Sequence, residues 1–386
     1  MRNCIEWVLA EHAIYALGGC TVPFYDTLGS DTVSFILHQT NLSTCILSRS
    51  ELVPLCKAKK TGLCPALKVA LLVDGTTPSA MALCKDAGIE TCTSLARVES
   101  YGGHVISTLQ YEGGHKHNPP SGEDIATFCY TSGTTGDPKG AMITHTNFLS
   151  SMAGMIDSVF KPIRTDRHLS YLPLAHIFER IVMAQILIAG GSVAFFRGDP
   201  TLLIDDINAC RPTILPAVPR VLNRIYDKVM AGIVSAGGIK KRLFESALKA
   251  KMDGLKHGYL THSIYDRLLF NKIKQALGMD CLRFLATGSA PLSEPVMFFF
   301  RCMLGIPVVE GYGQTEGSGS ATVSRMADIA TAGHVGSPTS CTEIVLVDVP
   351  EMGYFHTVRF HLHHCRFKAQ ILSISSLNMC VIGQNA

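Results

Sequence analysis

The sequence of 386 residues is long enough for two or three domains of about 150 residues each. Hydrophobic residues make up 47% and charged residues 17%, which predicts a large buried core and excludes an intrinsically disordered chain. The formal net charge is only +3 and no basic block stands out, so no nucleic-acid partner is expected.

The 14 cysteines are scattered without a CxxC motif or another metal-binding spacing. Cys129, Cys210 and Cys302 lie in apolar runs, so we expect them to pack as reduced core side chains of an intracellular protein. Glu6 interrupts the apolar N-terminus, which argues against a signal peptide. The uncharged run 181–196 contains glycines and polar residues and is too short to span a bilayer.

Apolar, β-branched runs alternate with helical patterns along most of the chain, which predicts an α/β fold with mainly parallel sheets. The stretch Gly102–Gly122 is rich in Gly, His and Pro and is expected to be a loop. The predicted strands are 66–73, 125–130, 192–196, 212–217, 281–287 and 306–310, and the predicted helices are 148–160 after Asn147 and 218–230.

The run Thr131–Gly140 follows one of these strands and contains three glycines, four hydroxyls and one lysine. Backbone amides freed by glycine, the hydroxyls and the Lys139 ammonium together suit a polyphosphate. A plain surface turn is the simpler interpretation, but turn chemistry does not require so many donors beside one lysine. The run is not a Walker loop, because Asp137 and Pro138 separate Gly136 from Lys139.

A polar cluster is expected where the segment Tyr171–Arg180 leaves a strand, because His176 is followed closely by Glu179 and Arg180. A lone histidine is more often a packed side chain than a catalyst. A cation or donor at a strand end could instead steer a substrate carboxylate or a developing acyl phosphate.

Two further strand ends carry glycine-bearing loops, Gly288–Pro291 and Gly311–Glu316, and Ser293 is a good N-cap for the helix after the first. Such loops can lie side by side at the carboxyl edge of one sheet, where ligands bind in open α/β folds. A plain turn and a half-buried core tyrosine are the structural alternatives.

The glycines of these two loops would let a flat purine approach the backbone, with Tyr312 stacked on it. Thr315 would then reach a phosphate oxygen, and the Glu316 carboxylate could hold Mg²⁺.

The order of these motifs resembles the long-chain acyl-CoA synthetase branch of the adenylate-forming (AMP-binding) superfamily. The segments that carry this resemblance, besides the phosphate loop, are 22–29, 172–180, 217–224 and 310–316. The resemblance runs from the first residues to about Tyr354.

The resemblance implies the N-terminal large domain of that superfamily: two αβαβα-type lobes with mainly parallel sheets and the start of a small β-barrel. The mobile C-terminal domain would be missing. The implied parts are a first lobe over 1–160, a second lobe over 161–330, the barrel start over 331–354 and a non-homologous, disordered tail over 355–386.

The resemblance also implies ATP-dependent activation of long-chain fatty acids to acyl-CoA, with Mg²⁺ and CoA. The implied phosphate-loop contacts are Thr131, Ser132, Gly133, Thr134, Thr135, Gly136 and Lys139. The other implied nucleotide contacts are Ile177, Arg180, Gly288, Ser289, Ala290, Glu310, Gly311, Tyr312, Gly313 and Thr315. The implied catalytic residues are Lys139, His176, Thr315 and Glu316, and the implied metal ligands are Thr131 and Glu316.

After Tyr354 the family's ribose-binding, hinge and adenylation-lysine motifs do not follow. The tail that follows is rich in histidine, but a metal site there is the less favoured interpretation. Because these motifs are missing, we expect this chain, as written, to adenylate fatty acid feebly or not at all.

Two alternatives stay open: a non-catalytic nucleotide- or acyl-binding remnant, and an adenylating enzyme for another carboxylic acid. The family also suggests peripheral association with the cytosolic face of an organelle membrane.

Overall fold

The computed structural model describes residues 1–25, 30–108, 119–131, 137–345, 348, 350 and 370–372. The chain divides into two compact units, Met1–His145 and Thr146–Ala386. Each unit has its own sheets and is described by itself. Among the described helices, none combines the length and the hydropathy that a bilayer span requires.

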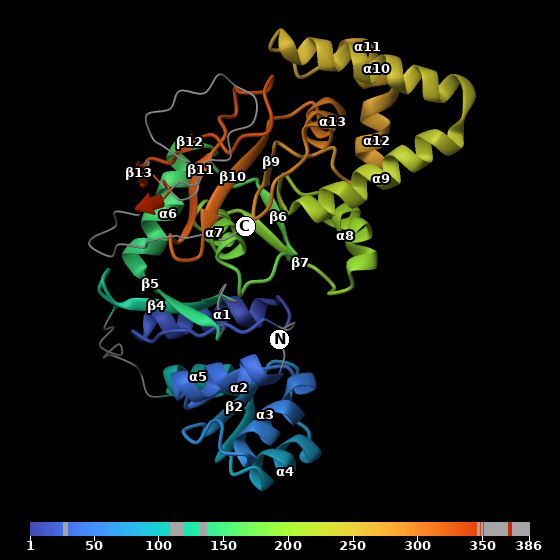
Figure 1. Cartoon of the computed structure of the whole chain (residues 1–386). Helices are drawn as coiled ribbons and strands as arrows, with labels where there is room; N and C mark the ends of the chain where they lie inside the picture. The colour runs from blue at the N-terminus through green and yellow to red at the C-terminus, as the bar shows by residue number, and fades with distance from the viewer. Residues whose placement is uncertain are drawn as a thin grey trace. The chain divides into compact units, whose positions relative to one another are not determined.

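The first unit holds a parallel sheet and an antiparallel hairpin (Figure 1). Its helices are α1 (Ile5–Ala16), α2 (Ser30–Thr40), η1 (Arg49–Glu51), α3 (Leu52–Lys60), α4 (Pro78–Asp86) and α5 (Leu95–Thr108). Its strands are β1 (Thr44–Leu47), β2 (Val69–Leu72), β3 (Thr91–Ser94), β4 (Ile125–Thr131) and β5 (Lys139–Thr144).

Strands β1, β2 and β3 pair in parallel, and β2 confirms the strand predicted over 66–73. The core beside this sheet includes Cys56, Cys64 and Cys84, all buried and free, so these thiols behave as the small core side chains expected of the cysteines. Burial also raises the pKa of each of these three thiols, which keeps them protonated at neutral pH.

Strands β4 and β5 form the antiparallel hairpin, in which Thr131 pairs with Lys139. The predicted strand 125–130 is therefore confirmed, and the phosphate loop is the connection between the two strands. Thr21 extends this hairpin, since its amide donates to the Ala126 carbonyl at 3.0 Å and its carbonyl accepts from the Phe128 amide at 2.9 Å.

The second unit is larger and begins within α6 (Figure 1). Its helices are α6 (His145–Ser158), α7 (Ile177–Ile188), η2 (Pro200–Leu202), α8 (Leu203–Cys210), α9 (Pro219–Ala236), α10 (Gly238–Lys256), α11 (Ser263–Tyr265), η3 (Asp266–Phe270), α12 (Asn271–Ala276) and α13 (Glu294–Leu304). Its strands are β6 (Arg167–Ser170), β7 (Ser192–Phe195), β8 (Ile214–Ala217), β9 (Phe284–Thr287), β10 (Val308–Gln314), β11 (Gly319–Val323), β12 (Ser337–Pro338), β13 (Glu343–Val345) and β14 (Gln370–Leu372).

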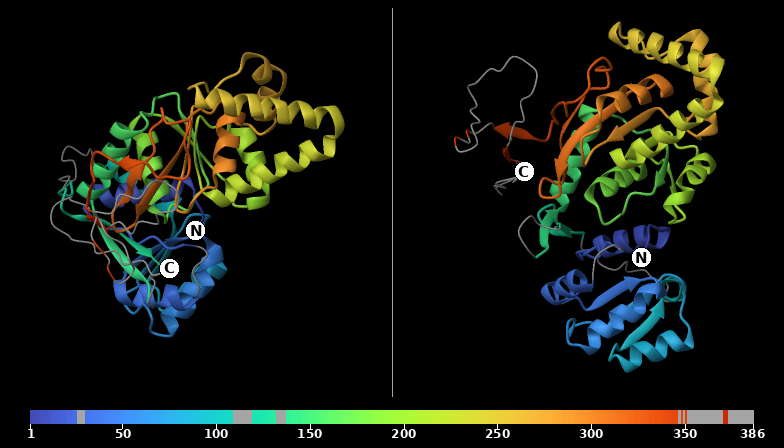
Figure 2. Two further views of the ribbon diagram at one scale, coloured as in Figure 1. Left: turned by 45° about the horizontal axis from the view of Figure 1, so that its top comes forward. Right: turned by 45° about the vertical axis from the view of Figure 1, so that its right-hand side comes forward.

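Seven of these strands form one sheet in the order β12-β11-β10-β9-β8-β6-β7. The five strands from β10 to β7 are parallel, whereas β11 and β12 are antiparallel, which confirms an α/β fold with mainly parallel sheets. Helices lie on both faces, as Figures 1 and 2 show. Leu215 and Leu285 pack with helices α8, α9 and α13 on one face, and Ile214 and Phe284 pack with α7 on the other.

Three predicted boundaries were wrong. The helix predicted to follow Asn147 starts at His145, so Asn147 lies in its first turn. The stretch 102–108, predicted as a loop, is the last part of α5, which begins at the buried Leu95. There the preceding helical turns outweigh the poor helix propensity of two glycines. Within the tail predicted to be disordered, residues 370–372 form β14 and pair with β13; the rest of 355–386 lies outside the described residues.

Two glycines with left-handed backbones offer a matched test of the packing in the second unit. Gly258 has φ +84° and no atom within 4 Å of an added Cβ, whereas Gly278 has φ +67° and an added Cβ would lie 2.4 Å from the Asn208 Cα. Substitution of Gly258 by Ala should destabilise the protein by about 1 kcal/mol, the cost of the left-handed conformation alone. Gly278→Ala should cost at least about 3 kcal/mol, because the backbone of α8 must also shift.

The measurement is the free energy of unfolding in urea, followed by circular dichroism, for the wild type and both variants. Equal destabilisation by the two substitutions would contradict the close contact between Gly278 and α8.

Candidate active site

The carboxyl end of β9 lies beside the middle of β10 in the sheet of the second unit. Thr287 pairs with Glu310, so Gly288 and Gly311 follow at the same level. A Cβ added to Gly288 would lie 3.0 Å from the Gly311 carbonyl oxygen. A Cβ added to Gly311 would lie 3.1 Å from the Thr322 carbonyl oxygen. Close backbone packing therefore favours glycine at both positions, and the two predicted segments meet as expected.

Glu310 ties the two segments together. Its buried carboxylate accepts a hydrogen bond from the Leu292 amide at 2.9 Å, and its own amide donates to the Ser324 hydroxyl at 2.9 Å. Burial raises the pKa of this carboxyl group. The turn that it holds exposes Ser289, whose φ is +68°, and Ala290.

The segment Gly311–Gln314, predicted as a loop, is instead the second half of β10. It pairs antiparallel with β11, and a Cβ on Gly313 would lie 1.8 Å from the Gly319 carbonyl oxygen. The prediction failed because the partner strand comes later in the chain and supplies hydrogen bonds that the local sequence does not reveal. The close packing of β10 against β11 thus explains why position 313 requires glycine.

The side chains at the end of β10 remain accessible. The Gln314 amide nitrogen donates to the hydroxyl of Tyr312, which is half-buried. The turn to β11 closes when the Gly317 amide donates to the Gln314 carbonyl at 3.2 Å. In this turn Thr315 is half-buried and Glu316 is exposed, so both can meet a ligand.

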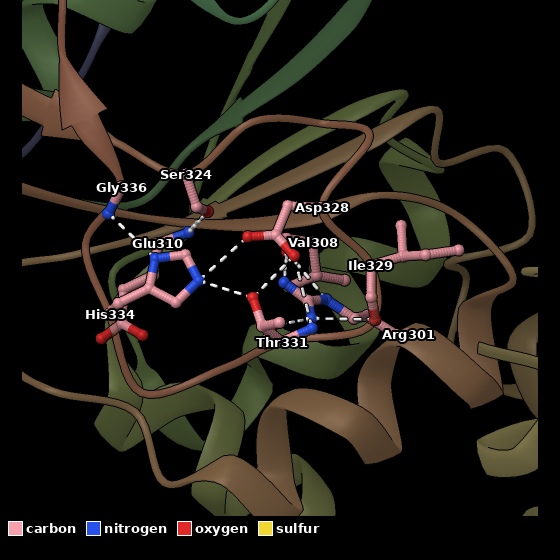
Figure 3. Close-up of polar contacts among 9 residues, drawn as sticks. All are labelled: Arg301, Val308, Glu310, Ser324, Asp328, Ile329, Thr331, His334 and Gly336. Carbon is pink, nitrogen blue, oxygen red and sulfur yellow. Dashed lines mark hydrogen bonds and ion pairs between the residues drawn. The ribbon is translucent and has the colours of Figure 1, made fainter. Parts of the chain in front are cut away.

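A buried arginine, which sequence reasoning missed, fastens the loop after β11 to the start of β10 (Figure 3). The Arg301 guanidinium of α13 donates to the Val308 carbonyl at 3.0 and 3.2 Å and to the carbonyls of Ile329 and Thr331. Arg301 is only 1% exposed, and burial lowers its pKa. No local pattern marks this role, because two of the three partners, Ile329 and Thr331, lie 28 and 30 residues away in the sequence.

The same loop is closed by a smaller cluster, which Figure 3 places beside Glu310. The Asp328 carboxylate accepts from the Thr331 hydroxyl at 2.6 Å and lies 3.0 Å from His334 Nε2. Although burial raises the pKa of Asp328, the Thr331 hydrogen bond and the nearby His334 and Arg301 outweigh it and lower that pKa. These contacts hold the loop after β11 in place beside Glu310.

His176 caps the start of α7, where its Nδ1 accepts from the Phe178 amide at 3.2 Å. Burial lowers the pKa of His176, which favours the neutral imidazole that this cap requires. Ile177 is buried at 2% exposed. Arg180 is 3% exposed, and burial lowers its pKa to about 9.

The polar cluster predicted from His176, Glu179 and Arg180 needs a correction. The fully buried Glu179 carboxylate is bound to His168 Nε2 of β6 at 2.8 Å, so it faces the sheet. Among the described residues, His168 Nδ1 and the second Glu179 oxygen have no hydrogen-bond partner. The pair anchors the first turn of α7 to β6.

The phosphate-loop residues belong to the first unit. Thr131 ends β4 and is half-buried, and Lys139 starts β5 and is exposed. Ser132, Gly133, Thr134, Thr135 and Gly136 lie outside the described residues. The convergence of this loop with the end of β10 stays a prediction.

The candidate metal ligands are oxygen donors of the kind that Mg²⁺ prefers, the Glu316 carboxylate and the Thr131 hydroxyl. Within the described part of the chain, no three or more His, Cys, Asp or Glu side chains gather as a preformed metal site. The exposed Glu316 carboxylate of the second unit can offer an oxygen to such an ion.

A small apolar cavity lies between α7 and the sheet. It has a volume of about 20 Å³, room for one water-sized group. Its lining includes Phe160, Phe178, Val182, Ile186 and Phe284. In this closed form it cannot hold an alkyl chain, which would need these side chains to move apart.

Comparison with known proteins places this chain among well-characterised relatives. A family model described as AMP-binding enzyme matches residues 1–358. A long-chain-fatty-acid–CoA ligase 5 of Rattus norvegicus is 40% identical over 359 residues, which are 92% of this chain and 51% of that protein. A peroxisomal long chain acyl-CoA synthetase 7 of Arabidopsis thaliana is 40% identical over 91% of this chain and 48% of its own length. The chain thus spans about half the length of the curated relatives it matches.

Solved structures share the fold. The A domain of a carboxylic acid reductase from Segniliparus rugosus, solved with AMP, has a TM-score of 0.70 at 21% identity and covers 92% of this chain and 53% of that one. The ATP-bound MatB of Rhodopseudomonas palustris has a TM-score of 0.59 at 19% identity and covers 90% of this chain and 55% of that one. At these identities the likeness shows the fold alone.

The raised pKa of Glu310 predicts how a substitution there depends on pH. The folded protein binds this proton more tightly than the unfolded chain does, so the stability contributed by the group is greatest below pH 4.3, roughly its unfolded pKa. It is lost as the pH rises through the folded pKa. Glu310→Gln keeps an acceptor for the Leu292 amide without the charge, so it should stabilise the fold at pH 7.5 and change little at pH 4.5.

Thermal unfolding midpoints of both proteins at the two pH values provide the test, with the exposed Glu99→Gln as a matched control. The prediction is contradicted if Glu310→Gln lowers the unfolding midpoint relative to wild type at pH 7.5 and does so less at pH 4.5. That result would show that the folded protein favours the ionised carboxylate.

Proposed function

The chain belongs to the AMP-binding enzyme family, and from this premise we propose that it acts in the ATP-dependent activation of long-chain fatty acids. The observation that carries the proposal is the carboxyl end of β9, where Gly288 lies beside Gly311 of β10 and the buried Glu310 holds the turn. Open α/β sheets bind ligands at such carboxyl ends. The 40% identity to long-chain-fatty-acid–CoA ligases supports the choice of acid.

The proposed reaction has two balanced steps. A fatty-acid carboxylate oxygen attacks the α-phosphorus of ATP, and the bond to the β-phosphate oxygen breaks, which gives acyl-adenylate and pyrophosphate. The CoA sulfur then attacks the acyl carbon, AMP leaves, and the thiol proton is released. The protein's main tasks are to position the reactants and to offset phosphate charge.

Each residue at the strand ends has a proposed role. Tyr312, which is half-buried beside Gly311, would stack on adenine. Thr315 would donate to the α-phosphate. Glu316 would bind Mg²⁺, which supplies charge neutralisation on the phosphates. The remaining nucleotide contacts proposed here are Ser289, Ala290 and Glu310.

The phosphate loop would act from the first unit, with Lys139 as the cation and Thr131 beside the metal. His176 would lie near the substrate carboxylate at the start of α7, and Ile177 and Arg180 near the acyl entrance.

The proposed location is intracellular, either in the cytoplasm or peripherally on the cytosolic face of an organelle membrane. The Arabidopsis relative is named as peroxisomal. The lobes 1–160 and 161–330 and the barrel start 331–354 are proposed as the functional divisions of the chain.

Glu316→Ala tests the metal role in the purified chain. The exposed carboxylate supports no fold contact that the structure describes, so the substitution should leave unfolding unchanged and weaken Mg·ATP binding at least about tenfold. Isothermal titration calorimetry with ATP and Mg²⁺ measures this, and the exposed Glu99→Ala is the matched control. Unchanged affinity in Glu316→Ala would remove this residue from the metal site.

Product analysis separates the function from its alternatives. ATP binding together with palmitate-dependent pyrophosphate release supports the ligase. ATP binding without acyl-adenylate favours a non-catalytic remnant, and a preference for octanoate or benzoate over palmitate favours another acid. A chain that binds no ATP under any condition would overturn the proposal.

A further inference from the structure

The turn between α9 and α10 forms the tip of a long helical hairpin. Figures 1 and 2 show these two helices meeting away from the seven-stranded sheet of the same unit. The turn is made by Gly237 at φ 61° and Gly238 at φ 45°, where left-handed backbone favours glycine. We define the hairpin tip as residues 231–243.

Buried side chains anchor both helices of the hairpin, since Leu222 and Ile225 of α9 and Phe244 of α10 are at most 2% exposed. Its tip presents aliphatic side chains to solvent instead. Ile239 is 85% exposed and Val234 59% exposed. An exposed isoleucine on a well-anchored projection is available for contact with an apolar partner.

The same tip is strongly cationic. Lys240, Lys241 and Arg242 are consecutive and exposed, and no Asp or Glu occurs from Lys228 to Phe244. The nearest carboxylate, Glu245, lies 3.8 Å from Lys241 in a solvent-exposed pair that offsets little of this charge. Three positive charges in a row equal the formal net charge of the whole chain, which is +3.

Exposed aliphatic side chains beside a cluster of cations match the two layers of an anionic lipid surface. Aliphatic groups can enter the acyl boundary while Lys and Arg contact lipid phosphates. A nucleic acid would use the cations but would leave Ile239 and Val234 without a partner, and the tip has no aromatic side chain to stack on a base. The combination therefore favours lipid.

We propose that the hairpin tip docks on an anionic phospholipid surface. This deepens the proposed function, because it names the surface through which an enzyme of membrane-partitioned fatty acids would reach them. Vesicle binding needs no catalysis, so a failure of this inference and a failure of the ligase assignment are separate results.

The experiment measures cosedimentation of the purified 386-residue chain with large vesicles. One set is pure phosphatidylcholine and the other contains 30% phosphatidylserine. The wild type should bind the anionic vesicles at least about tenfold more tightly, since each cation near such a surface contributes about 1 kcal/mol. K240A/K241A/R242A should lose at least about tenfold on the anionic vesicles. Ile239→Asp should also lose about tenfold, although it leaves the cations in place.

The matched control is K57A/K85A, which removes two exposed lysines of α3 and α4 outside the tip and should bind as the wild type does. Unfolding midpoints of all variants check that the exposed substitutions leave the fold intact. Equal anionic-vesicle binding by the wild type and both tip variants would overturn the proposal. So would absence of vesicle binding, or preference of the tip for a duplex DNA or RNA probe over the vesicles.

Discussion

The close approach of two backbones at Gly288 and Gly311 is the constraint on which the candidate site depends. The parallel pairing of β9 and β10 brings them together, and the 3.0 Å contact leaves no room for a side chain on Gly288. Glu310 then fixes the turn after β9 through the Leu292 amide, and the loop fastened by Arg301 lies beside it. These backbone contacts explain why glycine is favoured at both positions.

Local sequence was enough to find several buried strands, among them β2, β4, β8 and β9, and the glycine turn after β9, because β-branched runs and glycine clusters favour those conformations. It failed where a distant segment decides the structure. The segment 311–314 becomes strand only because β11 returns to pair with it. Glu179 turns to His168, and Arg301 bonds three carbonyls outside its own helix, and neither arrangement leaves a local pattern. The site residues were named by resemblance, and their roles stay proposals.

The proposed function requires one surface for a nucleotide and another for an apolar acid, and different parts of the second unit offer them. The strand ends offer polar and backbone groups suited to a nucleotide. The layer between α7 and the sheet is apolar, and the hairpin tip joins exposed aliphatic groups to cations. An enzyme that joins a water-soluble nucleotide to a membrane-partitioned acid needs both kinds of surface. The three consecutive cations favour a lipid surface as the partner because the exposed Ile239 lies next to them in the sequence.

The most direct test of the central claim is photoaffinity labelling of the purified chain with 8-azido-ATP and Mg²⁺, followed by peptide mapping. We predict that the label falls on peptides containing residues 288–291 or 308–316, and that excess ATP suppresses it. Labelling confined to the β1–β3 sheet of the first unit, or labelling that excess ATP does not reduce, would contradict a nucleotide site at the ends of β9 and β10.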